Sequence, residues 1–243
     1  GIVSTLHNFN NSNNKALASE LDIISQEQPM ELILPCLFSE LEAGALKNII
    51  QSINKINFLN HVIIGLDKAN HKQFLYAREY FAKLNVQHSI LWNDGPKLNS
   101  LQKVLHKEGI ADVEDGKGKN VWYCIGYALS RNTAEAVALH DCDIKTYDEN
   151  ILIKLFYPLV NRSMGYSFSK GYYPRYADNK LNGRVTRLLV TPLVKSLIML
   201  FGKNEYLEFI DSFKYPLAGE YAFRMHLLRE IRIPSDWGLE IGI

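Results

Sequence analysis

Short apolar runs alternate with amphipathic segments between residues 32 and 140, and this alternation restricts the possible folds more than any other feature of the sequence. Four runs have the length and apolar character of buried strands: residues 32–37, 62–66, 86–92 and 136–140. Ser39 is placed to cap a helix after the first run. Two sets of apolar residues recur at helical spacing: Leu41, Ala45, Ile49 and Ile53, then Phe74, Ala77, Phe81 and Leu84. Strands that alternate with helices predict an α/β fold, a mainly parallel sheet with helices on both faces.

The rest of the chain is expected to complete the same domain. Of the 243 residues, 47% are hydrophobic, which is enough for one sizeable core. Residues 1–29, with an Asn-rich patch and a short amphipathic piece, are expected to form an N-terminal arm or cap. The remaining expected elements are loops around a short helix at 93–119, helices at 121–130, 149–159 and 184–201, a strand at 166–170, and a helix that starts near Glu220.

Charge and cysteine content restrict the partners and the compartment. The formal net charge is only +1, so no overall field attracts the protein to nucleic acid or to an anionic membrane. Cys36, Cys124 and Cys142 are odd in number and lack a CxxC spacing, which favours a reducing compartment. No apolar run approaches the roughly 20 residues of a membrane span, and residues 1–30 lack the layout of a signal peptide. The sequence therefore predicts a cytoplasmic protein.

Two aspartates, Asp141 and Asp143, follow the strand expected at 136–140. At the carboxyl end of a buried strand, their oxygens could hold a hard divalent ion and a diphosphate. The ion would neutralise the phosphates and stabilise the charge that grows on a departing nucleotide. The spacing alone also fits a polar turn that caps the next helix. The position at the end of an apolar strand favours the metal site.

Three further segments carry candidates for a nucleotide site. Residues 35–40 end the first strand and Asp67 ends the second, at the edge of a parallel sheet where nucleotides bind. Glu40 could equally be a first-turn helix carboxylate and Asp67 an ordinary turn residue. Lys117 lies between Gly116 and Gly118, in what we interpret as a flexible loop that could bring an ammonium group to a phosphate. The loop lacks the spacing of a P-loop, so ATP hydrolysis is not supported.

Cations and single carboxylates in the second half of the chain suit an anionic or hydroxylated acceptor. Arginine forks and helix N-termini both favour anions, and the candidates are Lys170, Gly183, Arg184, Val185 and Thr186. A solvated basic loop is the alternative. Glu220 and Glu240 stand beside glycines, where they could accept hydrogen bonds from hydroxyls or act as helix caps.

The ensemble of these motifs resembles the glucosyl-3-phosphoglycerate synthases, retaining glycosyltransferases of the GT-A fold that make the precursor of the compatible solute glucosylglycerate. The resemblance covers about residue 30 to the end. It rests on Leu34-Pro35-Cys36-Leu37, Gly116-Lys117-Gly118, Asp141-Cys142-Asp143, Lys170-Gly171-Tyr172-Tyr173, Asn182-Gly183-Arg184-Val185-Thr186, Pro216-Leu217-Ala218-Gly219-Glu220-Tyr221 and Gly238-Leu239-Glu240-Ile241-Gly242.

The resemblance implies a role for each candidate. It places Pro35, Cys36, Leu37 and Glu40 beside the uridine, Lys117 at the nucleotide, and Asp143, with Asp141 nearby, at Mg²⁺ or a similar ion such as Mn²⁺ or Co²⁺. Gly183, Arg184 and Thr186 would hold the phosphate of 3-phosphoglycerate, and Glu240 would lie beside the reacting sugar. Residues 30–143 would then be the nucleotide-binding half of a GT-A domain, and residues 144–243 the acceptor-binding half.

Two departures from the family pattern accompany the resemblance. The family continues beyond the Gly-Leu-Glu-Ile-Gly stretch with a segment that supplies a histidine to the metal, so a third protein ligand is expected beyond Ile243 and the chain is expected to be a C-terminally truncated form. The acidic residue that the family carries just after the first strand is matched only approximately, because Ser39 precedes Glu40.

The predicted reaction is transfer of glucose from UDP-glucose or GDP-glucose to D-3-phosphoglycerate. A mannosyl donor, a free glycerate acceptor and a noncatalytic nucleotide-binding module remain open alternatives. A nucleotidyltransferase would carry a Gly-rich basic loop directly after the first strand, and residues 35–38 have none. The expected partners are small-molecule substrates, with no nucleic acid and no membrane. An exposed apolar helix in the 188–201 region would also fit a homodimer.

Overall fold

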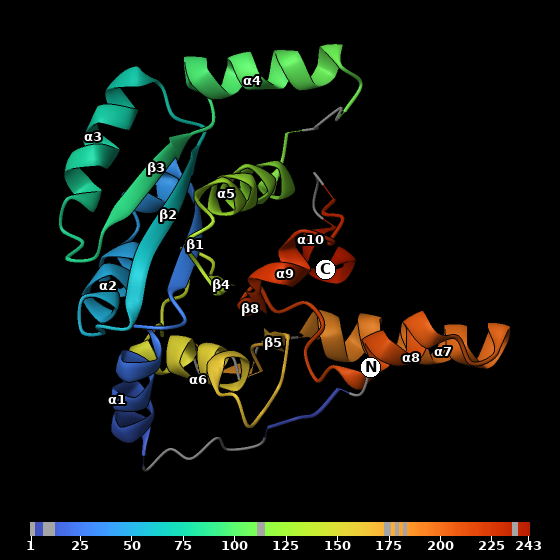
Figure 1. Ribbon diagram of the computed structural model, residues 1–243. Helices are drawn as coiled ribbons and strands as arrows, with labels where there is room; N and C mark the ends of the chain where they lie inside the picture. Colours follow the sequence, from blue (N-terminus) through green and yellow to red (C-terminus); the bar gives the residue numbers. More distant parts are fainter. Residues whose placement is uncertain are drawn as a thin grey trace.

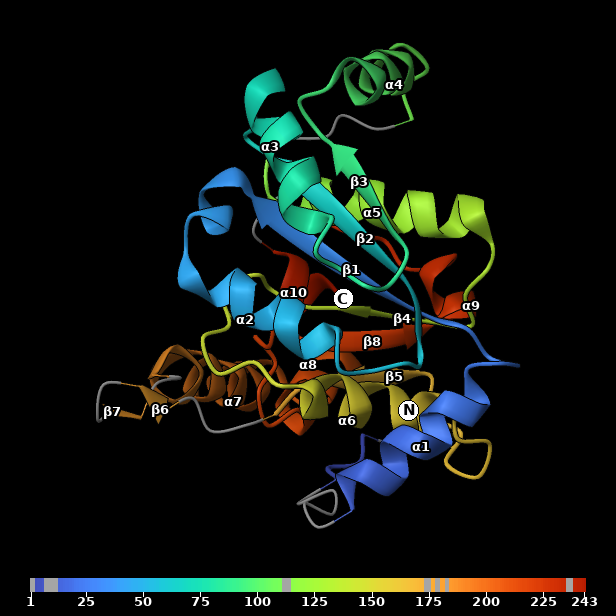
Figure 2. The ribbon, with the colours of Figure 1, turned by 90° about the vertical axis from the view of Figure 1, so that its left-hand side faces the viewer.

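A six-stranded mixed sheet lies at the centre of the computed structural model. The structure describes residues 3–6, 13–110, 115–172, 176–177, 180–181, 184–234 and 238–243. Its strand order is β3-β2-β1-β4-β8-β5 (Figures 1 and 2). The parallel strands are β1 (Met30–Leu37), β2 (Leu59–Asp67), β3 (His88–Trp92) and β4 (Ala136–Leu139). Strand β8 (Tyr221–Arg224) runs antiparallel between β4 and β5 (Phe168–Lys170). The structure confirms the predicted α/β class.

Helices cover both faces of the sheet because the strands are apolar on both sides. Leu32 and Leu34 of β1 belong to the core cluster that packs against α2 (Gly44–Ile53), α3 (His71–Phe81) and α6 (Glu149–Val160). Ile33 points to the other face and packs in the cluster that includes α5 (Lys117–Arg131). This alternation follows from the two-residue period of a strand.

The other elements lie around this sandwich. Helix α1 (Asn14–Ile24) packs on α6 and buries Leu21 in the core. The assignment of residues 1–29 to a separate N-terminal arm or cap stays a prediction. The remaining elements are η1 (Phe38–Leu41), α4 (Pro96–Lys107), β6 (Tyr176–Ala177), β7 (Lys180–Leu181), η2 (Thr186–Val190), α7 (Thr191–Phe201), α8 (Glu205–Ser212), α9 (Met225–Leu228) and α10 (Leu239–Gly242). None of the described helices is long and apolar enough to cross a membrane.

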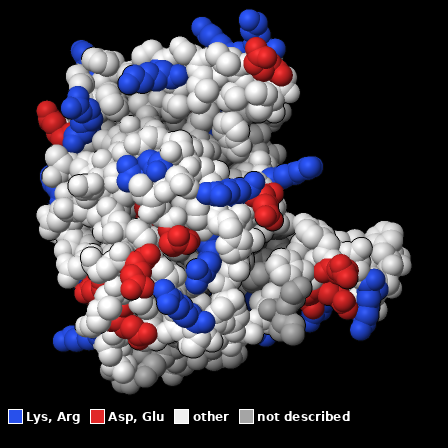
Figure 3. Space-filling view, in the orientation of Figure 1, with Lys and Arg blue, Asp and Glu red and all other residues white. Residues whose placement is uncertain are grey.

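Helices α7 and α8 project from the body of the protein (Figures 1 and 3). Most of the large apolar side chains at the start of this region and in α7 are exposed, as predicted for residues 188–201, although Val194 is buried. The exposed ones are Leu188, Leu189, Leu193, Met199, Leu200 and Phe201. The homodimer that this exposure suggested stays a prediction. On the face shown in Figure 3, acidic and basic groups are interspersed, in keeping with the net charge of +1.

Three local predictions were wrong. Ser39 does not cap a long helix, because the Glu40 carboxylate accepts a hydrogen bond from the Leu37 N–H and closes the short turn η1, and α2 begins only at Gly44. Lys117 is not in a flexible loop, since it is the first residue of α5. The helix expected near Glu220 is instead strand β8, which pairs with both β4 and β5.

Gly65 allows α5 to approach the sheet closely, and we expect Gly65→Ala to destabilise the fold. The Gly65 carbonyl accepts a 2.7 Å hydrogen bond from Asn120 Nδ2. An added Cβ would overlap Asn120 Oδ1 and lie 2.6 Å from Cys124 Sγ. The expected loss, about 2–3 kcal/mol of unfolding free energy measured in urea, reflects overpacking and a displaced buried amide.

Gly126→Ala is the matched control for this substitution. Gly126 is exposed in α5, and an added Cβ would meet nothing within 4 Å. Alanine is favoured over glycine in a helix interior by roughly 1 kcal/mol, so this variant is expected to be as stable as the parent or more stable. An unchanged urea midpoint for Gly65→Ala would contradict the packing argument.

Candidate active site

Lys117 lies at the centre of a group of charged side chains beyond the carboxyl end of β4. Its Nζ is 2.6 Å from Asp141 Oδ1 and 2.6 Å from Glu240 Oε1. The three side chains are between 19% and 28% exposed. They come from the first turn of α5, the loop after β4 and the first turn of α10, which are distant in sequence. The fold therefore joins three predicted site residues in one ion-paired group, which we call the Lys117 cluster.

The charges of this cluster do not balance. Burial works to lower the pKa of Lys117, yet Asp141 and Glu240 raise it above its ordinary value, so the ammonium stays charged. Burial raises the pKa of Asp141, and the nearby charges of Asp143 and Glu240 raise it further, against the opposing effect of Lys117. One lysine is thus shared by two carboxylates, with Asp143 close by, and such a site favours the binding of a further cation.

The end of β1 lies beside the two aspartates. Burial raises the pKa of Glu40, and the charges of Asp143 and Asp141 add to this effect, while the Leu37 N–H and the Cys36 thiol oppose it. Asp143 is exposed. The structure therefore brings Cys36, Leu37 and Glu40 together with Asp141 and Asp143, as the nucleotide-site prediction requires.

Pro35 and Asp67 occupy different positions relative to this edge. Pro35 is buried inside the sheet, where it pairs with Gly65 of β2. Asp67 pairs with Leu37 and so ends β2 at the same level as the end of β1. Burial and the neighbouring charge of Asp94 raise the pKa of Asp67. Asp67 thus shares the predicted edge but is grouped with Asp94, and strand β1 separates it from the aspartate pair that follows β4.

Lys170, at the end of β5, anchors the backbone of α10. Its Nζ donates a 2.6 Å hydrogen bond to the Glu240 carbonyl oxygen and lies 5.6 Å from the centre of the Tyr221 ring. Burial lowers the pKa of Lys170 to about 8, although the carboxylates of Glu240 and Glu220 favour its charged form. The side chain that was predicted to bind an acceptor thus fixes the backbone of Glu240, one of the three residues of the Lys117 cluster.

The low pKa of Lys170 predicts a change in stability at alkaline pH. An unfolded lysine titrates near about 10.4, so between about pH 8 and 10.4 the unfolded chain binds more protons than the folded one. The contribution of Lys170 to the free energy of unfolding therefore rises with pH across that window. We expect the rise to be absent in Lys170→Met and present in Lys195→Met, an exposed control in α7, when urea unfolding is measured from pH 7 to 10. Parallel pH profiles for the two variants would contradict the assignment.

The structure describes only some of the residues that were predicted to hold the acceptor phosphate. Gly183 lies outside the described residues, and Arg184 and Val185 are exposed at the start of the helical segment that continues into η2. Thr186 is 4% exposed, and its Oγ1 has no hydrogen-bond partner among the described residues. Within the ranges described, no hydrogen bond or ion pair joins these residues to the cluster. Their grouping with the site stays a prediction.

Gly219 and Tyr221 lie beside the site but were given no role in the sequence analysis, whereas Glu220 was considered as an acceptor of hydrogen bonds from hydroxyls or as a helix cap. An added Cβ at Gly219 would overlap the Asp141 carboxylate, so only glycine allows this close approach. Glu220 is 1% exposed, and its charge acts on the neighbouring Lys170. Tyr221 is fully buried, and burial, followed by the charges of Glu240 and Asp141, raises the pKa of its hydroxyl. No clear local signal marked them, because β8 is a four-residue strand that begins only at Tyr221.

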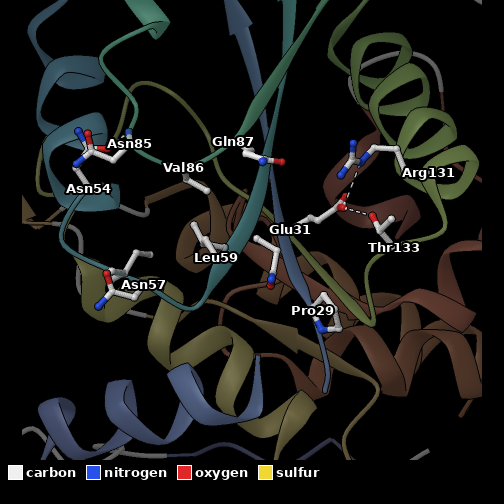
Figure 4. A pocket seen from close by; sticks show the side chains of 12 residues that line it. Pro29, Glu31, Asn54, Asn57, Leu59, Asn85, Val86, Gln87, Arg131 and Thr133 are labelled. Carbon is white, nitrogen blue, oxygen red and sulfur yellow. Dashed lines mark hydrogen bonds and ion pairs between the residues drawn. The ribbon is translucent and has the colours of Figure 1, made fainter. Parts of the chain in front are cut away.

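A hollow of about 660 Å³ lies at the opposite edge of the sheet (Figure 4). Glu31 at the start of β1 accepts hydrogen bonds from Arg131 Nε, at 3.3 Å, and Thr133 Oγ1, at 2.7 Å. Asn54, Asn85 and Gln87 are among the residues that line the hollow. None of the predicted site residues lies there, and ligands of open parallel sheets bind at the carboxyl edge instead. We therefore assign the candidate site to the Lys117 cluster.

Comparisons with known proteins identify relatives of the whole chain. The chain is 41% identical over 243 residues to a glucosyl-3-phosphoglycerate synthase of Persephonella marina, covering 100% of this chain and 60% of that protein. It is 36% identical over 245 residues to a glucosyl-3-phosphoglycerate synthase of Methanococcoides burtonii, covering 99% and 59% respectively. The chain thus spans about three fifths of the length of these curated relatives. No protein-family model matches it.

Solved structures confirm the fold. A crystal structure of glucosyl-3-phosphoglycerate synthase from Mycobacterium tuberculosis with Mn²⁺, UDP and glucosyl-3-phosphoglycerate has a TM-score of 0.63 and 21% identity, covering 92% of this chain and 66% of that chain. A second structure, with Mn²⁺, UDP-glucose and glycerol 3-phosphate, has a TM-score of 0.64 and 20% identity, covering 98% and 69%. At this identity the likeness establishes the GT-A type of fold.

Proposed function

From the homology of the whole chain to part of the glucosyl-3-phosphoglycerate synthases, we propose that this protein transfers glucose from UDP-glucose or GDP-glucose to D-3-phosphoglycerate, with retention at the anomeric carbon. The observation that carries the proposal is the Lys117 cluster. It puts a charged lysine between Asp141 and Glu240 at the carboxyl edge of the sheet, where a GT-A fold binds its nucleotide. The names of the relatives supply the substrate class.

The carboxylates fit a divalent metal ion of the Mg²⁺ or Mn²⁺ type. Asp141 and Asp143 provide hard oxygen atoms, and Lys117, which also pairs with Glu240, offsets only part of the negative charge. Such oxygen donors suit Mg²⁺ and Mn²⁺. In this proposal Asp143 coordinates the ion, and Asp141 lies beside the ion. When bound, the ion would neutralise the diphosphate and the charge that grows on it as it departs.

The chain's own residues would bind and orient the donor. Lys117 would contact the diphosphate, and Cys36, Leu37 and Glu40 would border the nucleoside. Glu240 would lie beside the reacting sugar, positioned by the hydrogen bond from Lys170 to its carbonyl oxygen. The protein supplies no nucleophile in this scheme. The bond from the anomeric carbon to the diphosphate breaks, the bond to the acceptor oxygen forms on the same face, and a departing diphosphate oxygen takes the acceptor's proton.

In the proposed acceptor site, Arg184 clamps the phosphate of 3-phosphoglycerate, so Arg184→Ala is expected to raise the KM for this acceptor. A charge-assisted hydrogen bond to phosphate contributes roughly 1.5–3 kcal/mol, which corresponds to about a 10- to 100-fold change. The KM for the donor should change by less than about threefold. Arg187→Ala, which removes a second exposed arginine from the same segment, is the control. An unchanged acceptor KM would remove the clamp from the proposal.

A two-step experiment tests the function. Calorimetric titration of UDP, GDP, UDP-glucose and GDP-glucose with Mg²⁺ present identifies the donor, and product analysis with 3-phosphoglycerate or glycerate identifies the acceptor. The proposal predicts a glucosylated phosphoglycerate and a free nucleoside diphosphate. Release of pyrophosphate from a nucleoside triphosphate and sugar phosphate would instead indicate a nucleotidyltransferase. Nucleotide binding without turnover would indicate a binding module.

A further inference from the structure

Two buried thiols and a carboxylate meet at the end of β1. Cys36 Sγ, a Glu40 carboxylate oxygen and Cys142 Sγ all lie within 4.8 Å of one another. In the part of the chain that the structure describes, this is the one group of three or more such side chains that are placed to hold a metal ion together. Cys36 and Cys142 are 0% and 1% exposed, and Glu40 is half-buried, so the group has one open side.

The backbone holds these three side chains in place before any ligand arrives. Glu40 accepts a 2.9 Å hydrogen bond from the Leu37 N–H, which fixes its carboxylate over the end of β1. The Cys36 thiol donates a 3.4 Å hydrogen bond to the Leu37 carbonyl oxygen, which holds its sulfur at the end of the strand. Because Cys36 is the next-to-last residue of β1 and Cys142 follows the parallel neighbour β4, the two thiols remain adjacent as long as β1 and β4 are paired.

The donor set differs in kind from the aspartate pair beside it. Two thiolates and one carboxylate suit Zn²⁺ and other thiophilic ions, whereas Mg²⁺ prefers oxygen ligands alone. A tetrahedral ion with sulfur ligands at about 2.3 Å holds its two sulfurs roughly 3.8 Å apart. The observed separations therefore require only small side-chain shifts, and a water molecule could fill the fourth position.

We propose that Cys36, Glu40 and Cys142 form a second metal site, selective for Zn²⁺ and similar thiophilic ions. On binding, the two thiols release their protons to the solvent, and the sulfurs and the carboxylate coordinate the ion. The site exists independently of the proposed glycosyl transfer. Its consequence for activity rests on the proposed function: an ion here would crowd the nucleoside-bordering residues Cys36, Leu37 and Glu40, so Zn²⁺ would compete with the donor while Mg²⁺ would not.

Cadmium titration of the reduced chain, with excess Mg²⁺ present, tests the site directly. The expected result is one tightly bound Cd²⁺ per chain, with the ultraviolet sulfur-to-cadmium absorption of two thiolates. Cys36→Ser and Cys142→Ser should each lose at least half of this absorption and bind Cd²⁺ at least about tenfold more weakly, since each removes one of two thiolate ligands. Unchanged absorption in either variant, or none in the parent, would overturn the proposal.

Cys124→Ser is the matched control, because Cys124 is equally buried but lies in the other core cluster, near Asn120 Oδ1. It should keep the full absorption. Glu40→Gln, on a half-buried side chain, provides a variant whose folding is less at risk, and it should keep the absorption while weakening Cd²⁺ binding. Asp143→Asn should leave Cd²⁺ binding intact, and loss of binding there would assign the ion to the aspartate pair instead. None of these readouts depends on turnover.

Discussion

Asp143→Ala is expected to lower kcat/KM for glucosyl transfer by roughly a thousandfold or more and to abolish its dependence on Mg²⁺. The expected size follows from the several kcal/mol of charge stabilisation that a bound divalent ion supplies to a departing diphosphate. Asp143 is exposed beside the half-buried Asp141, so its loss removes the carboxylate that is most accessible to an incoming ion. The measurement is the initial rate at a series of Mg²⁺ concentrations.

Asp211→Ala provides the control for a lost carboxylate, because Asp211 is exposed on α8, in the projecting part of the molecule. Its metal dependence should match that of the parent. Calorimetry of donor binding to Asp143→Ala separates a lost ion from a misfolded protein, since the substitution leaves the proposed nucleoside contacts at the end of β1 unchanged. Full metal-dependent transfer by Asp143→Ala would show that the ion is held elsewhere.

Lys117→Met is expected to reduce kcat by about 10²–10³, the usual range for the loss of one charge-stabilising group in an active site. The ammonium of Lys117 contacts both Asp141 and Glu240 at 2.6 Å, so its removal leaves two carboxylates without their shared cation. Loss of a nearby positive charge raises a carboxylate's pKa. The pH at which metal affinity falls to half should therefore move upward in the variant, which a purely steric defect would not produce.

Lys119→Met is the natural comparison, because Lys119 lies in the same turn of α5 but pairs with the exposed Asp115. This variant should retain the parent's kcat and pH profile. Metal affinity measured by calorimetry from pH 5 to 8 gives the second readout. If Lys117→Met kept both the rate and the pH profile, Lys117 would have no role at the diphosphate.

Much of the fold was predictable, because its parallel strands are short, apolar and separated by helices with one apolar face. The strands at 32–37, 62–66, 86–92 and 136–140 were confirmed, as was the short helix within 93–119. The resemblance to the glucosyl-3-phosphoglycerate synthases was also confirmed by the curated relatives. Strand β8 was not predicted, because its pairing partners β4 and β5 lie about 50 or more residues away in the chain and a four-residue run carries little periodic signal.

The candidate site was predictable only in part. Asp141 and Asp143 could be identified locally, because they follow a buried strand directly. Glu240 and Lys117 are 123 residues apart, and their contact depends on α10 docking beneath α5. Gly219 gave no local sign of its role, since the need for glycine arises from the Asp141 carboxylate that packs against it.

The sequence by itself determined the α/β class, the parallel strands and the residue types at the carboxyl edge, because strand and helix periodicities are local properties of the chain. Only the tertiary structure decided which charges meet. It paired Lys117 with two carboxylates, gave Lys170 a backbone carbonyl of α10 as its partner, and brought the free thiols of Cys36 and Cys142 within 4.8 Å of each other. These contacts depend on how distant segments pack, and the burial and charge that set their chemistry exist only after packing.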